Sequence, residues 1–265
     1  MAVPSLRLVV RNTAPVRPER GCVLYWMTAA RRTRWNFGLE HAVDTAVQLG
    51  KPLLVFEPLR CGYRYASDRL HRFVLDGMAD NAARFAAAGI AYLPYVEPKT
   101  GAGKGLLAAL ARDACLVVTD EFPCFFLPRM VEVAALQLDV RLVSVDGNGL
   151  LPLRDVEQAF PTAYAFRRHL QKTLPAHLGE FPEDDPLARQ DLTRGATIPT
   201  GVAAPWPSAP SELASLPIDH AVVPVAGTVV GVAREQVACG QGGFPDAVND
   251  LIASAVGRGG EHGGR

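Results

Sequence analysis

The chain has 265 residues, of which 49% are hydrophobic and 20% are charged, and its basic and acidic residues balance. This composition is ordinary for a globular protein, and no apolar run approaches the roughly 18 residues that a membrane span needs. The five cysteines contain no CxxC pair, which is typical of reduced thiols, so we expect a cytoplasmic protein that does not bind membranes. Residues 1–178 hold 22 Lys and Arg against 16 Asp and Glu, so this part is modestly basic.

Five short apolar runs alternate with four helix-like segments in the first 150 residues. The expected strands, in chain order, are Val23–Thr28, Leu53–Glu57, Ala91–Val96, Cys115–Thr119 and Arg141–Val145. The expected helices between them are Asn36–Leu49, a long segment that Ser67 caps and Gly89 ends, Gly105–Arg112 and Leu127–Leu138. Because each connection contains a helix, the strands are predicted to be parallel. We therefore expect an α/β, Rossmann-like, doubly wound fold with a five-stranded parallel sheet.

The pattern changes after the fifth predicted strand. Thr162 can cap one further helix, Ala163–Leu174. Residues 179–225 are rich in Pro, Ala, Ser and acidic side chains and predict an interdomain linker. Residues 226–265 are rich in Gly and Val and predict a poorly structured tail. The first 178 residues then form the folded domain.

Polar residues end the predicted strands, at the edge where parallel sheets bind their ligands. These residues are Thr28, Glu57, Glu97, Asp120 with Glu121, and Asp146. Such an acidic rim could hold Mg²⁺ and phosphates, but acids at strand ends more often cap helices or face water. No nucleophile or phosphate loop accompanies these acids, so we expect them to cap the following helices or to face water, and we predict no metal site. We also expect Thr28 and Asp120 to emerge side by side.

The glycine-rich run Gly101-Ala102-Gly103-Lys104-Gly105 lacks the spacing of a P-loop and of GxGxxG. We interpret it as a flexible helix start that could bind an anion weakly. The six histidines show no metal-ligand spacing and there is no GxSxG motif, so a hydrolase has little support. No catalytic residue is predicted.

Two clusters combine basic and aromatic residues. They are Arg31, Arg32 and Arg34 with Trp35, and Tyr164, Phe166, Arg167, Arg168, His169 and Lys172. Arginine beside a flat ring can grip phosphate while a base or dye stacks. A solvated helix face with one buried aromatic side would give the same pattern, and both interpretations stay open. The first cluster is the better candidate because it follows the first strand.

The segment Val23–Met27, followed by Asn36–Leu39, resembles the N-terminal antenna domain of class II DNA photolyases. Further matching segments are Lys51–Phe56, Arg69–Gly77 and Thr119–Pro123. The ordered matches cover about residues 20–178. The resemblance implies a member of the cryptochrome/photolyase family, flavoprotein lyases that use light and reduced FAD to split cyclobutane pyrimidine dimers in damaged DNA.

The resemblance also implies a site for an antenna chromophore, often a deazaflavin. The residues carried over as its lining are Trp26, Met27, Thr28, Arg31, Arg34 and Asn36, with Asp120, Glu121 and Phe122 closing it from the fourth strand. The sequence departs from the family pattern at Ala29-Ala30 and at Trp35, where the family carries an Arg-Asp pair and an Asp.

Nothing after Pro224 resembles the flavin motif of the family, so the FAD site of the full-length enzymes is not seen in this sequence. We therefore expect a truncated or frame-disrupted product, an antenna half that is inactive alone. In the family, the missing half contacts DNA, and a separate chain could supply it. Two alternatives stay open: an ATP- or AMP-binding module related to electron-transfer flavoproteins, which would bind across the ends of the first and fourth strands, and a non-catalytic scaffold remnant.

Overall fold

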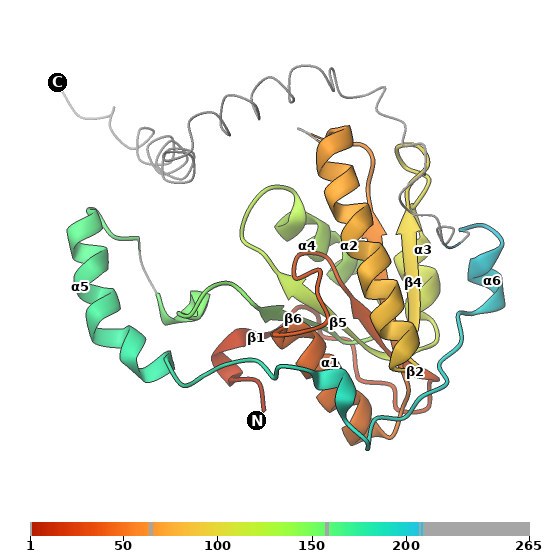
Figure 1. The fold of residues 1–265 in the computed structure, drawn as a ribbon, viewed down its shortest axis with the longest axis horizontal. Helices are drawn as coiled ribbons and strands as arrows, with labels where there is room; N and C mark the ends of the chain where they lie inside the picture. Colours follow the sequence, from red (N-terminus) through yellow and green to blue (C-terminus); the bar gives the residue numbers. More distant parts are fainter. Residues whose placement is uncertain (1, 64–65, 157–158, 207, 209–265) are drawn as a thin grey trace.

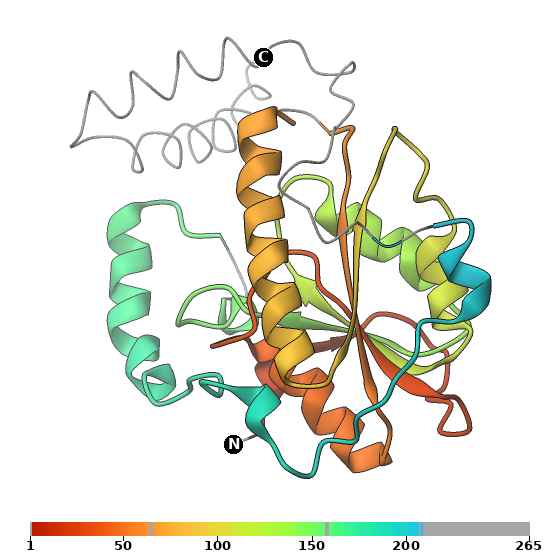
Figure 2. The same ribbon diagram turned by 45° about the vertical axis from the view of Figure 1, so that its right-hand side comes forward.

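The computed structural model describes residues 2–63, 66–156, 159–206 and 208, which form an α/β fold on one sheet with helices on both faces (Figures 1 and 2). The strands are β1 (Leu8–Val10), β2 (Cys22–Trp26), β3 (Leu53–Leu59), β4 (Ala91–Val96), β5 (Ala114–Glu121) and β6 (Leu142–Asp146). The α-helices are α1 (Phe37–Leu49), α2 (Asp68–Ala87), α3 (Leu106–Ala111), α4 (Leu127–Gln137), α5 (Ala163–Thr173) and α6 (Thr200–Ala203). Short 3-10 turns are η1 (Ser5–Arg7), η2 (Leu153–Asp155), η3 (Leu174–His177) and η4 (Pro186–Ala188).

The sheet order is β1-β6-β5-β2-β3-β4. The five strands predicted from the sequence are all present and run parallel to one another, which confirms the doubly wound α/β fold. A sixth strand that the sequence did not predict, β1, pairs antiparallel with β6 at the edge. The apolar run of β1 is only three residues long, and its partner lies more than 130 residues away, so no local pattern reveals the pairing.

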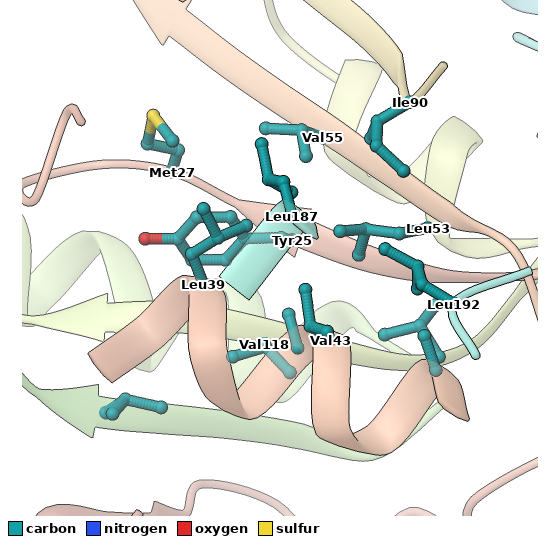
Figure 3. Close-up of a cluster of buried hydrophobic side chains, with 14 of the residues drawn as sticks. Tyr25, Met27, Leu39, Val43, Leu53, Val55, Ile90, Val118, Leu187 and Leu192 are labelled. Atoms are coloured by element: carbon teal, nitrogen blue, oxygen red, sulfur yellow. The ribbon is translucent and has the colours of Figure 1, made fainter. Parts of the chain in front are cut away.

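The two faces of the sheet carry different helices. One core cluster joins α1 and α2 to side chains such as Tyr25 and Met27, and the other joins α3 and α4 to side chains such as Leu24 and Trp26. This division follows from the strand geometry, since successive side chains point to opposite faces. Figure 3 shows Tyr25 and Val55 packed over α1 in the first cluster.

Polar caps fix where several helices begin, as the sequence predicts for Ser67 and Thr162. The side-chain oxygen of Asn36 accepts hydrogen bonds from the backbone N–H groups of Gly38 and Leu39, at 2.9 and 3.1 Å. Ser67 and Thr162 cap α2 and α5 in the same way. Such caps satisfy backbone donors that a helix cannot pair internally, and each typically stabilises the helix by about 1 kcal/mol.

The chain after α5 packs back onto the domain. Leu187 and Leu192 join the α1 cluster, where Figure 3 shows Leu187 near Tyr25 and Val55, and Val202 of α6 joins the α3 and α4 cluster. By contrast, α5 has no buried residue and lies beside the sheet rather than on it (Figures 1 and 2). The predicted linker is described only to residue 206 and at residue 208, and the predicted tail, residues 226–265, lies outside the described residues. None of the described helices is long and apolar enough to cross a membrane.

Burial of the Cys22 thiol predicts a loss of stability at alkaline pH. Cys22 is 4% exposed, and this burial raises the pKa of its thiol to about 12. A thiol in the unfolded chain ionises near pH 8.5, so above that pH the unfolded chain releases a proton that the folded chain keeps. The stability is therefore complete below about pH 8.5 and falls as the pH rises toward 12, by about 1.4 kcal/mol per pH unit.

Cys22→Ala should flatten the dependence of the free energy of unfolding on pH in this range, as measured by urea unfolding at a series of pH values. Cys124→Ala removes a thiol that is only partly buried and serves as the matched control. An unchanged slope in Cys22→Ala would contradict the prediction.

Candidate functional site

A mostly apolar cavity of about 540 Å³ lies at the carboxyl ends of β2, β3 and β4. The ends of β2, β3 and β4 contribute Trp26, Phe56 and Tyr95, and the helices of the same face contribute Leu106 and Met130. These strands are parallel neighbours, so their carboxyl ends meet at one edge, which is where α/β sheets bind ligands. A hollow of this volume is large enough for a ligand of several fused rings.

Trp26 gives this cavity an unused hydrogen-bond donor. The residue is 3% exposed, and its indole Nε1 is buried without an acceptor anywhere in the described part of the chain. A buried donor without a partner costs about 1–3 kcal/mol. Because Trp26 lines the cavity, an acceptor on a bound ligand could satisfy its N–H group.

Cationic side chains line the same cavity. The guanidinium of Arg31 donates to Glu57 Oε1 at 3.0 Å and to the Pro58 carbonyl at 2.7 Å. Arg60 lies over the ring of Phe126, 5.2 Å from its centroid. Lys104 forms no ion pair with any described residue, so its charge is uncompensated. The lining therefore suits a flat apolar ligand that also carries an anionic group.

Aromatic rings form part of the cavity wall. The rings of Tyr63 and Phe126 are 5.8 Å apart, with an angle of 39° between their planes. Burial raises the pKa of the phenols of Tyr63 and Tyr95, so both stay neutral at physiological pH. Neutral rings in these positions can contact the face or the edge of a flat ligand.

Glu97 shapes the glycine-rich run beside the cavity. Its Oε1 accepts from the backbone N–H groups of Gly101 and Gly103, at 2.8 and 3.4 Å, and its Oε2 accepts from the Cys61 N–H at 3.2 Å. Gly101 has a φ of 87°, a conformation that side chains rarely adopt. A Cβ atom on Gly103 would approach the Tyr95 ring to 3.1 Å. The run is therefore a fixed wall of the cavity.

Asp120 organises the turn after β2. Its Oδ2 accepts from the backbone N–H groups of Thr28, Ala29 and Ala30, at 2.8, 2.8 and 3.0 Å, and its Oδ1 accepts from the Tyr25 hydroxyl at 2.6 Å. Thr28 and Asp120 thus emerge side by side, as the sequence predicts. The donors of this turn are already directed at a carboxylate of the protein itself.

The other acids at the strand ends also bind the protein's own donors. Glu57 Oε2 accepts from the side chains of Asn81 and Tyr92, at 3.0 and 2.7 Å. Asp146 accepts from the backbone N–H groups of Asn148 and Leu153. The expectation that such acids cap the following helices or face water is wrong for Glu57, Asp120 and Asp146. All three are buried, and each binds donors of another segment instead.

Three residues predicted as site residues line the cavity: Trp26, Thr28 and Arg31. Met27 lies on the opposite face of the sheet and is fully buried among the α1 cluster. Asn36 is buried as the cap of α1, where it also donates to the carbonyls of residues 30 and 32.

The remaining predicted residues lie outside the cavity lining. Glu121 binds Arg11 and Arg154, at 2.7 and 2.6 Å. Phe122 stacks on the exposed ring of Phe125, with 6.5 Å between the ring centroids. Arg34 is about half exposed and lies 3.8 Å from Asp184 and 3.6 Å from Asp185.

Sequence reasoning missed most of the cavity lining. The missed residues include Arg60, Tyr63, Tyr95, Lys104, Phe126 and Met130. One signal was present: the glycine-rich run follows β4 directly, and the parallel sheet brings the end of β4 to the same edge as the end of β2. The side chains from α4 had no such signal, because the crossover from β5 to β6 decides which face α4 covers.

The chain is similar in sequence to a deoxyribodipyrimidine photo-lyase of Methanothermobacter thermautotrophicus, with 31% identity over 170 residues. The match covers 62% of this chain but only 37% of the archaeal protein. No family model matches the chain. The resemblance to photolyases noted in the sequence is therefore confirmed as similarity to one such enzyme over somewhat more than a third of that enzyme's length.

Proposed function

We propose that this chain is the antenna part of a photolyase of class II and that its cavity binds a flat chromophore of the deazaflavin type. The observation that carries the proposal is the buried Trp26 N–H group, unpaired among the described residues, in a cavity that is mostly apolar and flanked by cations. An apolar pocket with a few placed polar groups is the usual form of a cofactor site.

The lining residues fit such a ligand by their chemistry. Phe56 and Tyr95 offer apolar contact to a ring system, and Trp26 offers a donor to a ring carbonyl. Arg60 and Lys104 offer positive charge to an anionic substituent. When bound, an antenna chromophore absorbs near-ultraviolet or blue light and passes the excitation to a flavin. The part of this chain is to hold that ligand and keep water from its ring.

In this proposal, light-dependent repair of pyrimidine dimers belongs to the assembled protein. The FAD and the contacts to DNA would come from a second half, either a further domain or a separate chain. In photolyases, reduced FAD is the group that splits the dimer, so we do not expect the antenna part alone to repair DNA. The support is the similarity to the archaeal photolyase.

A nucleotide-binding module of the electron-transfer-flavoprotein type is not favoured. That module would bind ATP or AMP across the ends of β2 and β5, and backbone N–H groups of the turn after β2 would hold its phosphates. The N–H groups of Thr28, Ala29 and Ala30 instead bind Asp120. A phosphate bound to this turn would have to displace the buried carboxylate of Asp120, which is also negatively charged.

The proposal is tested by the absorption of protein purified from its own host, and by titration of the colourless protein with a deazaflavin followed by fluorescence. We expect a near-ultraviolet or blue band and one bound ligand per chain. Trp26→Phe keeps the ring but removes the donor, so it should weaken binding about tenfold, the usual loss for one hydrogen bond. Leu107→Trp places a large side chain in the cavity from a half-buried position and should abolish binding.

Trp35→Phe is the matched control, because Trp35 is half exposed and does not line the cavity. It should leave the affinity unchanged. A colourless host-purified protein that also fails to bind the deazaflavin would refute the antenna function, and it would leave the scaffold remnant as the better account.

A further inference from the structure

A second hollow, of about 660 Å³, shares no lining residue with the first cavity. It lies between the turn after β2, the last turns of α2 and residues 185–194, which pass the end of α2 (Figure 2). Its charged and polar side chains are Thr33, Arg34, Arg84, Asp185 and Arg194. Three guanidinium groups therefore surround one hollow against a single lining carboxylate.

The positive charge of this hollow is poorly compensated. Arg84 donates to the Thr33 hydroxyl at 3.3 Å and forms no ion pair with any described residue. Within the described part of the chain, Arg194 donates only to backbone carbonyls, of which the nearest is that of Ala88 at 2.8 Å. Since a carbonyl carries no net charge, Arg194 keeps its full positive charge at the hollow.

Arg34 is a third cation at the hollow, and it forms ion pairs with Asp184 and Asp185. Its guanidinium lies 3.8 Å from Asp184 and 3.6 Å from Asp185. Among the described residues, Arg84 and Arg194 are therefore the two guanidinium groups at the hollow that keep a surplus of positive charge without an ion pair. A surplus of positive charge around a hollow favours the binding of an anion there.

Thr33 adds a neutral donor to the same place. Its side chain is buried, at 2% exposed, and its oxygen accepts from Arg84. A hydroxyl that accepts one hydrogen bond still has its own proton to donate. Two guanidinium groups and one hydroxyl around a hollow are a donor set that matches the oxygens of phosphate.

Capping of α2 accounts for only part of this arrangement. Basic side chains near a helix C-terminus are favourable, and the bond from Arg194 to the carbonyl of the cap residue Ala88 is of this kind. Arg84 makes no such bond to a carbonyl, and Arg34 belongs to the turn after β2 rather than to α2. The convergence of the three side chains therefore needs another explanation.

We propose that this second hollow binds a phosphate group, held by the guanidinium groups of Arg84 and Arg194 and by the hydroxyl of Thr33. The phosphate can belong to a small molecule or to the backbone of a nucleic acid, and the chemistry of recognition is the same in both cases. The site is separate from the chromophore cavity, so it stands whether or not a chromophore binds.

The test is calorimetric titration of the full chain at low salt with inorganic pyrophosphate and, separately, with a short DNA duplex. Arg84→Gln removes one charge and only one hydrogen bond within the described protein, so the fold should survive, which circular dichroism checks. We expect this variant to bind at least one of the two probes about tenfold more weakly. Thr33→Val should weaken the same probe severalfold.

Arg72→Gln is the matched control, because Arg72 is an exposed arginine of the same helix that does not line the hollow. If Arg84→Gln and Thr33→Val weaken the binding of pyrophosphate and Arg72→Gln does not, the ligand is a small phosphate compound. If the same pattern is found with the duplex alone, the ligand is a nucleic-acid backbone. The proposal is overturned if neither probe binds, or if Arg72→Gln weakens binding as much as Arg84→Gln does.

Discussion

Asp120→Ala is expected to lower the free energy of unfolding by about 4 kcal/mol, because it leaves buried donors without an acceptor. The carboxylate is 4% exposed and accepts four hydrogen bonds, three from the turn after β2 and one from Tyr25. Each stranded donor costs about 1–3 kcal/mol, and water that enters the new space recovers part of that loss. Urea unfolding of the variant measures the effect.

Glu121→Ala is the neighbouring control. Its carboxylate pairs with Arg11 and Arg154 near the surface, where ion pairs contribute about 1 kcal/mol or less. If Asp120→Ala were no more destabilising than Glu121→Ala, the turn after β2 would not depend on Asp120. Asp120→Ala should also weaken deazaflavin binding, since Thr28 and Arg31 reach the cavity from the turn after β2.

Arg7→Met is expected to lower the free energy of unfolding by about 3–5 kcal/mol, the usual cost of breaking a buried ion pair from one side. The Arg7 side chain is fully buried, 3.9 Å from Asp146, and it donates to the carbonyl of Leu150 at 2.7 Å. Its guanidinium also lies over the ring of Phe37, 4.5 Å from the centroid. Burial lowers the pKa of Arg7, and Asp146 opposes that shift.

The large effect follows from the position of Arg7. It lies directly before β1 and contacts both the loop after β6 and the first turn of α1. Methionine fills much of the volume but leaves the backbone carbonyls of Asp146 and Leu150 without this donor, and the Asp146 carboxylate without its ion-pair partner. Arg11→Met is the control, because Arg11 is partly exposed and pairs with Glu121 near the surface. Thermal unfolding that shifts equally in both variants would contradict the prediction.

The parallel sheet and the helix caps were predictable because both depend on local patterns. Ser67 and Thr162 cap the helices that the sequence assigned to them, and Asn36, predicted as the first residue of its helix, is the cap of α1. Each of these side chains bonds to a backbone N–H two or three residues away, so the contact is visible in the sequence itself. The edge strand β1 was not predictable in this way, because its partner β6 lies at the other end of the domain.

The candidate site was only partly predictable. Trp26 and Met27 are adjacent in sequence, yet only Trp26 lines the cavity, because neighbouring residues at the end of a strand point to opposite faces of the sheet. The predicted Asp120 proved to be a carboxylate that organises a turn, and that role needs the donors of a segment about 90 residues earlier.

By itself, the sequence determined the fold class, the order along the chain of the five parallel strands and the helices between them, and the edge of the sheet where polar residues gather. These properties follow from periodicity and from short-range hydrogen bonds. Only the tertiary structure decided that Tyr95 and Phe126 join Trp26 around one cavity and that Arg84 and Arg194 meet at another. Both gatherings depend on how the strands are ordered in the sheet and on where the chain after α5 returns, and residues so far apart in sequence leave no local pattern.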